Sequence, residues 1–362
     1  MNFLSMLTLL LSTVTFSQVG SSWRDWNNPS RFEKNFNYNF DRLPLQGDIG
    51  KETGKGWSGS YWPTHKGGIA YRWNHPNPRN FKYISPSKEN IMSMSSDEIA
   101  MLSPAEKYDI FMSRYDYPLT RRVLSSTRES AKEWRGICHG WAPASLHHVE
   151  PSAISVQNNE GVQINFGSSD VKALLSYYYA IESKSQVRQV AKRCFGKANP
   201  RGNCKGVNPG AFHIIIANYI GLRSEGFLAD VDRYKEVWNQ AVVSYHSEII
   251  GYKNVRRRDR KRNIVEKIMI KTRMSYVEEL DINAGNPDLD FEDTPMWDPV
   301  FGTIFQQREE VEYFYTISLN SRGQIIDGEW DGYQRPDFLW TKKKDTFKGY
   351  FSGINKIYKP IF

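Results

Sequence analysis

Residues 136–145 read GICHGWAPAS and place Cys138 between two glycines, at the start of an expected helix. A thiol at that position meets the positive end of the helix dipole and backbone N–H groups that have no partner inside the helix. Both favour the thiolate, and later the oxyanion that forms on an attacked carbonyl group. The segment therefore predicts a nucleophilic cysteine on a helix, and acyl transfer through Cys138.

The other two cysteines, Cys194 and Cys204, are separated by a loop rich in Gly, Pro, Asn and Lys. Such a spacing favours a local disulfide, which would leave Cys138 as the unpaired thiol of an exported protein. The alternative is that all three cysteines are reduced, buried packing residues.

Residues 1–17 begin with an apolar stretch that carries no charged side chain and end on small and polar residues. This pattern is typical of a signal peptide, because the apolar core is too short for a comfortable transmembrane helix. No later segment is long and apolar enough to cross a membrane. We therefore expect a secreted or periplasmic protein without an integral membrane segment after signal removal.

The chain is basic, with a formal net charge of +8, and 14% of its residues are aromatic. The strongest charge run, Arg256 to Arg262, is short and flanked by strand-like sequence, which favours a solvated hairpin tip. No aromatic side chains alternate with these basic residues, so we expect no nucleic-acid partner.

Two regions follow the leader. Residues 18–99 are rich in Trp, Tyr, Asn, Gly and Pro and show little periodicity, which predicts an irregular, aromatic-rich N-terminal region. Helical signals begin near residue 100, where Ser103, Pro104 and Glu106 form a capping pattern. Residues 100–362 are therefore assigned to the catalytic domain.

Within this domain the pattern predicts helices from residue 138 and over residues 168–183. The expected strands cover residues 152–157, 162–166, 211–221, 226–232, 236–250, 264–280, 311–319 and 324–330.

Acyl transfer by a cysteine needs a base for the thiol proton and a group that orients this base. His213 lies early in the expected strand 211–221, just after a loop-like segment, and is the predicted base. Asp230 is the preferred orienting group, followed by Asp232 and then Asn239. The order helix with Cys, strand with His, strand with Asp predicts an α+β fold of the papain-like or transglutaminase-like kind, in which the cysteine helix packs on an antiparallel sheet.

Trp134 and Trp141 flank the cysteine and are predicted to line the substrate channel or to donate indole N–H bonds to the oxyanion, with plain packing as the alternative. The histidines do not show the spacing of a metal site, so we expect no metal and no cofactor. A dependence on a divalent cation such as calcium stays open, although no EF-hand loop is present and the acidic stretch 288–293 is assigned to a solvated loop.

Six separated blocks of this chain resemble the transglutaminase elicitor family, which comprises secreted enzymes of oomycetes and of some bacteria, including marine vibrios. The blocks are WSGSYWPTHKGGIAYRW from Trp57, WRGICHGWAPASL from Trp134, VKALLSYYY from Val171, NPGAFHIIIANYIG from Asn208, EVWNQAVVSY from Glu236 and IIDGEWDGYQRPDFLW from Ile325. They occur in the order of the family and span most of the chain after the leader.

The resemblance implies a protein-glutamine γ-glutamyltransferase that forms isopeptide cross-links, or deamidates glutamine, through a Cys138 thioester. The family's histidine maps onto His213 and its acid onto Asp230 or Asp232. The partners would be protein substrates that present glutamine and lysine or other primary amines. Two alternatives stay open, namely a papain-like cysteine peptidase or amidase acting on peptide or cell-wall amide bonds, and a noncatalytic surface-binding protein.

Overall fold

The structure is a computed structural model that describes residue 23 and residues 25–74, 81, 83–194, 206–234, 236–280 and 297–362. The predicted signal peptide, Cys204 and the acidic stretch 288–293 lie outside these residues. In the described part of the chain, no helix combines the length and the apolar character that a membrane span requires.

The described helices are α1 (Lys88–Ser93), α2 (Ser96–Ala100), α3 (Pro104–Phe111), α4 (Pro118–Ser126), α5 (Cys138–His147), α6 (Ser168–Tyr177), α7 (Pro209–Ile216), α8 (Arg257–Arg260) and α9 (Ile354–Ile357). The strands are β1 (Gln46–Asp48), β2 (Ile154–Gln157), β3 (Gln163–Phe166), β4 (Val187–Val190), β5 (Phe227–Asp230), β6 (Asn239–Tyr252), β7 (Glu266–Val277), β8 (Arg308–Leu319), β9 (Ile325–Trp330) and β10 (Phe338–Lys342). Both α6 and α7 continue into π-helical turns, at Tyr178–Glu182 and Ala217–Leu222.

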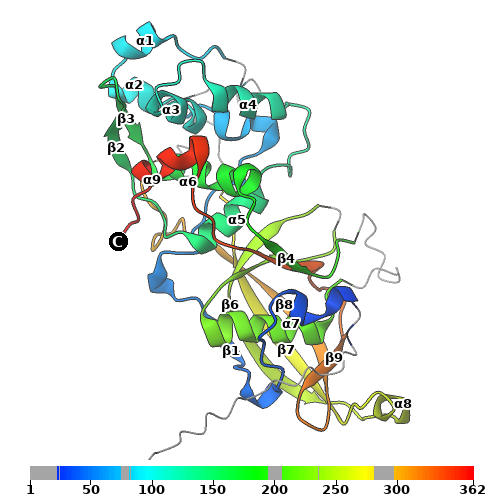
Figure 1. The fold of residues 1–362 in the computed structure, drawn as a ribbon. Coiled ribbons are helices and arrows are strands. Elements are labelled where there is room, and N and C mark those ends of the chain that lie inside the picture. Colours follow the sequence, from blue (N-terminus) through cyan, green and yellow to red (C-terminus); the bar gives the residue numbers. More distant parts are fainter. Residues whose placement is uncertain are drawn as a thin grey trace, which may run out of the picture.

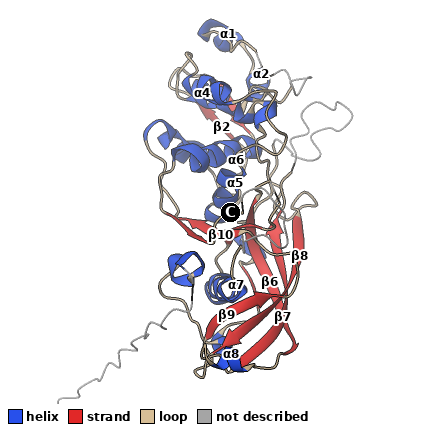
Figure 2. Cartoon of the chain, turned by 90° about the vertical axis from the view of Figure 1, so that its right-hand side faces the viewer, coloured by secondary structure: helices blue, strands red, loops and turns tan. Residues whose placement is uncertain are grey.

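The main sheet is antiparallel, with the strand order β4-β10-β5-β6-β7-β8-β9, and β1 pairs with β6. Figure 1 shows helices α1–α4 and α6 at one end of the molecule and the sheet at the other, with α5 between them. In Figure 2 the sheet curls around α7. The fold is therefore a mixture of helices and a curled antiparallel sheet, in agreement with the α+β class expected from the sequence.

Several local predictions are confirmed. Ser103 and Glu106 form a reciprocal capping box at the start of α3, with Pro104 as the first helical residue. The expected strand pair forms as the antiparallel hairpin β2–β3, and the basic run contributes α8 to the connection between the paired strands β6 and β7.

The expected strand at 211–221 is wrong, because this segment is helical. The side chain of Asn208 accepts a hydrogen bond from the Gly210 N–H, and Pro209 occupies the first helical position. These two residues are a helix start signal that outweighs the β-branched run of isoleucines after it. Every residue of α7 is buried, so the apolar run reflects a helix enclosed by the curled sheet.

Two buried ion pairs hold α6 in place, one to α3 and one to the segment after α5. The ammonium group of Lys107 lies 2.5 Å from Asp170, and Lys172 pairs with Glu150 just beyond α5. The ammonium group of Lys172 also donates to the Ser58 carbonyl at 3.0 Å. Removing one partner of such a pair leaves a buried charge and typically costs about 3–5 kcal/mol. These contacts tie α6 to α3, to the segment after α5 and to the segment around Ser58.

Residues of the predicted N-terminal region contribute to the same structure as the predicted catalytic domain. Strand β1 pairs with β6, and Trp57 and Trp62 are buried in an apolar cluster that also contains Trp141 and Tyr313. The boundary near residue 100 stays a prediction.

Candidate active site

Cys138 is the first residue of α5, as the sequence predicts, and it is buried, with a relative exposure of 5%. The turn before it is held by the segment around residue 61, because the Ile137 N–H donates to the Tyr61 carbonyl at 2.7 Å. The neighbouring glycines permit this close approach. A Cβ at Gly136 would lie 2.3 Å from the Tyr61 carbonyl oxygen, and one at Gly140 would lie 2.1 Å from the Ser176 carbonyl oxygen.

The sulfur of Cys138 is surrounded by hydrogen-bond donors from two elements. The Nδ2 atom of Asn239, at the start of β6, donates to Sγ at 3.4 Å. The backbone N–H groups of Asn239 and of His139 also act on the sulfur. The thiol itself points toward the Val237 carbonyl oxygen, at 4.0 Å. Such donors stabilise a thiolate, and they stabilise equally the negative charge that returns to sulfur when a thioester is resolved.

The pKa of the Cys138 thiol is shifted in the opposite direction from the one that the sequence predicts. Burial is the largest influence and raises the pKa of the Cys138 thiol above its ordinary value. The hydrogen bonds from Asn239 and His139 lower this pKa, whereas the negative charge of Glu279 raises it. The raised pKa favours the protonated thiol at neutral pH. The position of Cys138 at the helix start alone therefore does not produce a thiolate.

His213 lies on α7 rather than on a strand and is completely buried. Its Nδ1 atom is 2.8 Å from the Tyr315 hydroxyl, its ring centroid is 5.5 Å from that of Phe40, and its Nε2 atom is buried without a hydrogen-bond partner. Burial lowers the pKa of His213 to about 4, so the ring is neutral at pH 7. These contacts differ from those of the Cys138 sulfur, and the structure does not bring the two side chains together.

Asp230 is connected to the cysteine by way of Asn239, which contacts the sulfur. It is the last residue of β5 and is paired with Asn239 of β6 in antiparallel register. Burial, and then the charges of Asp337 and Asp232, raise the pKa of Asp230 to about 9, and its Oδ2 atom has no hydrogen-bond partner. Asp230 is therefore a neutral carboxylic acid at pH 7, beside the residue that contacts the sulfur.

Asp232 has a different environment. It is only partly buried, and one of its carboxylate oxygens accepts the Tyr234 N–H at 2.8 Å, closing a turn after β5. Burial raises the pKa of Asp232. No hydrogen bond joins Asp230 or Asp232 to His213, whose Nδ1 atom is engaged by Tyr315.

The two flanking tryptophans separate into two environments. Trp134 is partly exposed, and the Arg135 guanidinium lies 5.9 Å from its ring centroid. Trp141 lies one turn after Cys138 on α5 and is completely buried, yet its indole Nε1 has no hydrogen-bond partner. The indole faces Gly59, where an added Cβ would lie 3.2 Å from Nε1.

Sequence reasoning missed two further polar residues of this region. Gln240 follows Asn239 on β6, and its Nε2 atom donates to the Glu279 carboxylate at 2.9 Å. Glu279 lies just beyond β7, where it forms a bridge to Gly59. Burial raises the pKa of Glu279 to about 7, and the hydrogen bond from Gln240 lowers it. Because both residues reach the site only through strand pairing, no local motif marks them.

Cys138 is the free cysteine in the described part of the chain, and Cys194 is disulfide-bonded. The expected partner, Cys204, lies outside the described residues, so the Cys194–Cys204 pairing stays a prediction. Among the described residues, no three or more His, Cys, Asp or Glu side chains are grouped as a metal site.

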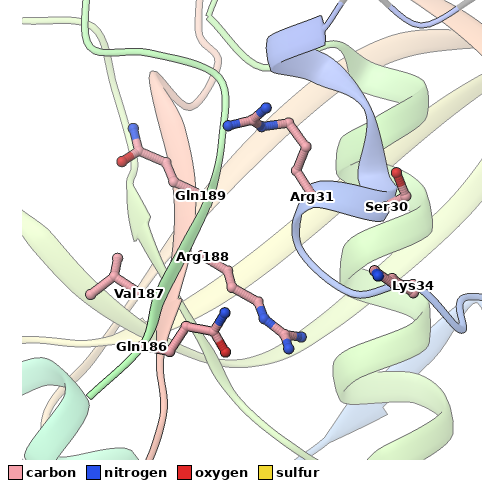
Figure 3. Close-up of a pocket in the computed structure, with 7 residues that line it drawn as sticks. All are labelled: Ser30, Arg31, Lys34, Gln186, Val187, Arg188 and Gln189. Carbon is pink, nitrogen blue, oxygen red and sulfur yellow. The ribbon is translucent and has the colours of Figure 1, made fainter.

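Two surface cavities lie apart from the thiol. One, of about 600 Å³, is shown in Figure 3 and is lined by Ser30, Arg31, Lys34 and residues 186–189. The other, of about 470 Å³, has in its lining the end of β10 and the loop after it, over residues 341–344, together with His147 and residues 224–226. Neither includes Cys138, so neither is the site of the predicted chemistry.

The sequence pattern of the family "Transglutaminase elicitor" matches residues 29–351. No curated protein matches. Among solved structures, the chain is similar to the crystal structure of the GP42 transglutaminase from Phytophthora sojae, with a TM-score of 0.62 and 20% sequence identity over 91% of this chain and 94% of that chain. At this identity the likeness shows a shared fold, and the family match extends over most of the sequence. The chain belongs to the transglutaminase elicitor family.

Proposed function

We propose that the protein is a protein-glutamine γ-glutamyltransferase that acts through a thioester on Cys138. The observation that carries this proposal is the environment of the sulfur, at the start of α5 and within reach of the Asn239 side chain and two backbone N–H groups. The family match and the fold shared with a transglutaminase support the same chemistry.

The first half-reaction is acylation. The thiol loses its proton, and the sulfur attacks the γ-carboxamide carbon of a substrate glutamine. The carbon–nitrogen bond breaks, the nitrogen takes up a proton, and ammonia departs. A γ-glutamyl thioester remains on Cys138. The backbone N–H of Cys138 and the unpaired indole N–H of Trp141 are the donors that we assign to the oxyanion.

The second half-reaction is transfer. A lysine or other primary amine attacks the thioester carbon and loses a proton, and the carbon–sulfur bond breaks. The sulfur leaves as a thiolate stabilised by Asn239, and an isopeptide bond remains. Entry of water in place of the amine gives glutamate, so exclusion of water decides between cross-linking and deamidation.

The assignment of the base is open to direct test. His213 was predicted from the sequence, but its ring contacts Tyr315 and Phe40. We retain Asp230 as a residue that positions Asn239 across the β5–β6 pair. Export by the predicted signal peptide and the Cys194–Cys204 disulfide belong to the same proposal.

The test is incorporation of a dansyl-labelled alkylamine into casein by the chain from residue 18 onward, with Cys138→Ala as the control. Label that depends on Cys138 supports the proposal. New casein fragments in place of label would indicate a peptidase, and a shift of glutamine to glutamate without label would indicate a deamidase. If casein stays unchanged with both proteins, the transferase assignment is wrong and the noncatalytic alternative stands.

A further inference from the structure

Three polar atoms beside the thiol are buried and have no hydrogen-bond partner. They are the indole Nε1 of Trp141, the side-chain oxygen Oε1 of Gln240 and the carboxyl oxygen Oε1 of Glu279. Buried polar groups in folded proteins are almost always hydrogen-bonded, so each exception calls for an explanation. Three exceptions in one region indicate a site that is completed by a ligand.

Strand pairing connects these atoms to one another and to Cys138. The second terminal atom of each side chain takes part in a hydrogen bond between them, in which Gln240 Nε2 donates to Glu279 Oε2 at 2.9 Å. Glu279 bridges to Gly59, and the Trp141 indole lies against Gly59. Asn239, the neighbour of Gln240, contacts the sulfur, and the charge of Glu279 acts on the Cys138 thiol.

The chemistry of the three atoms matches one functional group. One atom is a donor and two are acceptors, whereas a primary carboxamide offers a carbonyl acceptor and an NH₂ group with two donors. The indole N–H fits the carbonyl oxygen, and the two side-chain oxygens fit the nitrogen. An amine that enters later also presents N–H donors to the same two oxygens.

We propose that Glu279, together with Gln240, binds the nitrogen of the substrate carboxamide and then that of the entering amine, and that Glu279 carries the proton at this nitrogen. This inference rests on the proposed function. During acylation the Glu279 carboxylate accepts the thiol proton and returns it to the departing nitrogen as the carbon–nitrogen bond breaks. During transfer it accepts the proton of the attacking amine, and the thiolate then regains that proton.

The titration of Glu279 suits this task. A pKa of about 7 means that the carboxyl group accepts and releases protons near neutral pH, where general acid–base catalysis is most effective. The titratable groups that act on Glu279 or are acted on by it are Glu278, Tyr276 and Cys138. His213 is neutral over the same range and lies against Tyr315.

The test uses Glu279→Gln, which keeps the shape of the side chain and its hydrogen bond to Gln240 but cannot carry the proton. The matched control is Glu278→Gln, which removes the same charge one residue earlier. We expect Glu279→Gln to lower kcat/KM for amine incorporation by about 10²- to 10⁴-fold and to abolish its pH dependence near pH 7. Glu278→Gln should keep the rate and a pH dependence whose midpoint lies somewhat lower, because the charge of Glu278 raises the pKa of Glu279.

A second readout does not depend on turnover. The rate of Cys138 alkylation by iodoacetamide, measured against pH, reports the pKa of the thiol. Because the Glu279 charge raises that pKa, Glu279→Gln should lower it and speed alkylation at neutral pH. The proposal therefore predicts a thiol that reacts faster in an enzyme that transfers more slowly, in a variant that melts at the same temperature as the wild type, because an opened site would also expose the thiol.

The outcomes separate the two proposals. A wild-type enzyme that incorporates amine, with Glu279→Gln equal to it in rate and pH profile, overturns the role of Glu279. A wild-type protein that incorporates no amine overturns the proposed function, and an unchanged thiol pKa in Glu279→Gln then also overturns the coupling of Glu279 to the cysteine. If Glu279→Gln does not fold, Glu279→Asp replaces it, and we expect a partial loss of rate with the pH dependence kept.

Discussion

Asn239 contacts the Cys138 sulfur with its side chain while its main chain pairs with Asp230 across adjacent antiparallel strands. The sulfur is supplied by a helix and its strongest polar partner by the sheet. A neutral Asp230 is thus the strand-pairing partner of the residue that contacts the nucleophile.

Asn239→Ala removes the side-chain donor to the sulfur. A hydrogen bond to a charged group contributes about 1.5–3 kcal/mol, so we expect the thiol pKa to rise and alkylation at pH 7.5 to slow roughly ten- to a hundredfold. The measurement is the iodoacetamide rate against pH. Asn355→Ala, which removes an exposed asparagine on α9, is the control and should react like the wild type. Equal rates for both variants would contradict the assigned contact.

Asp230 makes the stability of the protein depend on pH. Its folded pKa, about 9, lies above the ordinary value of 3.8, so the folded state holds a proton that the unfolded chain releases. Stability from this group is complete below pH 4 and is lost as pH rises toward 9. Above pH 8 we expect the unfolding free energy of Asp230→Asn to exceed that of the wild type by roughly 1–3 kcal/mol, and its melting temperature to be higher. A melting temperature that changes with pH in the same way for wild type and variant, from pH 5 to 9, would refute this.

His213 should act on stability rather than on the nucleophile. Its folded pKa of about 4 lies below the ordinary 6.5, so its contribution is complete above pH 6.5 and is lost as pH falls toward 4. His213→Asn should therefore reduce stability at pH 7 by about 1–3 kcal/mol and flatten its decline below pH 6.5, while Cys138 alkylation keeps its pH profile. A folded variant with a changed alkylation profile would restore His213 as the base of the reaction.

Gly140→Ala should displace the start of α5. The added Cβ would meet the Ser176 carbonyl oxygen, and a main-chain atom cannot turn aside as a side chain can. We expect a loss of about 1–3 kcal/mol or more of unfolding free energy. Gly332→Ala is the control, because a Cβ there meets nothing within 4 Å. Chemical denaturation of both variants gives the comparison, and equal stabilities would argue against the described packing.

Much of the fold could be predicted from the sequence where local chemistry determines it. Ser103 with Glu106 marks the start of α3, and the alternation along β7 and β8 marks long strands. The isoleucine run after His213 predicts a strand, but a fully buried helix is as apolar as a buried strand, and the helix signal lies in Asn208 and Pro209.

The site was predictable only in part. Cys138 could be identified because its glycines and its helix start are adjacent in sequence. Glu279 and Gln240 could not, since their neighbours are brought together by strand pairing between distant segments. A histidine that follows a loop-like segment is typical of a base at a cleft edge, but a helix directs the His213 ring toward Tyr315 in the curled sheet.

The position of α5 between the helices and the sheet has one more consequence. The thiol belongs to helix α5, whereas Asn239 lies on strand β6 and Glu279 just beyond strand β7. The side chains that tune the thiol thus come from the sheet and its margin. A fragment or a half-folded chain thus has a cysteine of ordinary reactivity. Only docking of the two parts produces the tuned thiol, so the alkylation profile of Cys138 can serve as a sensor for the completion of folding.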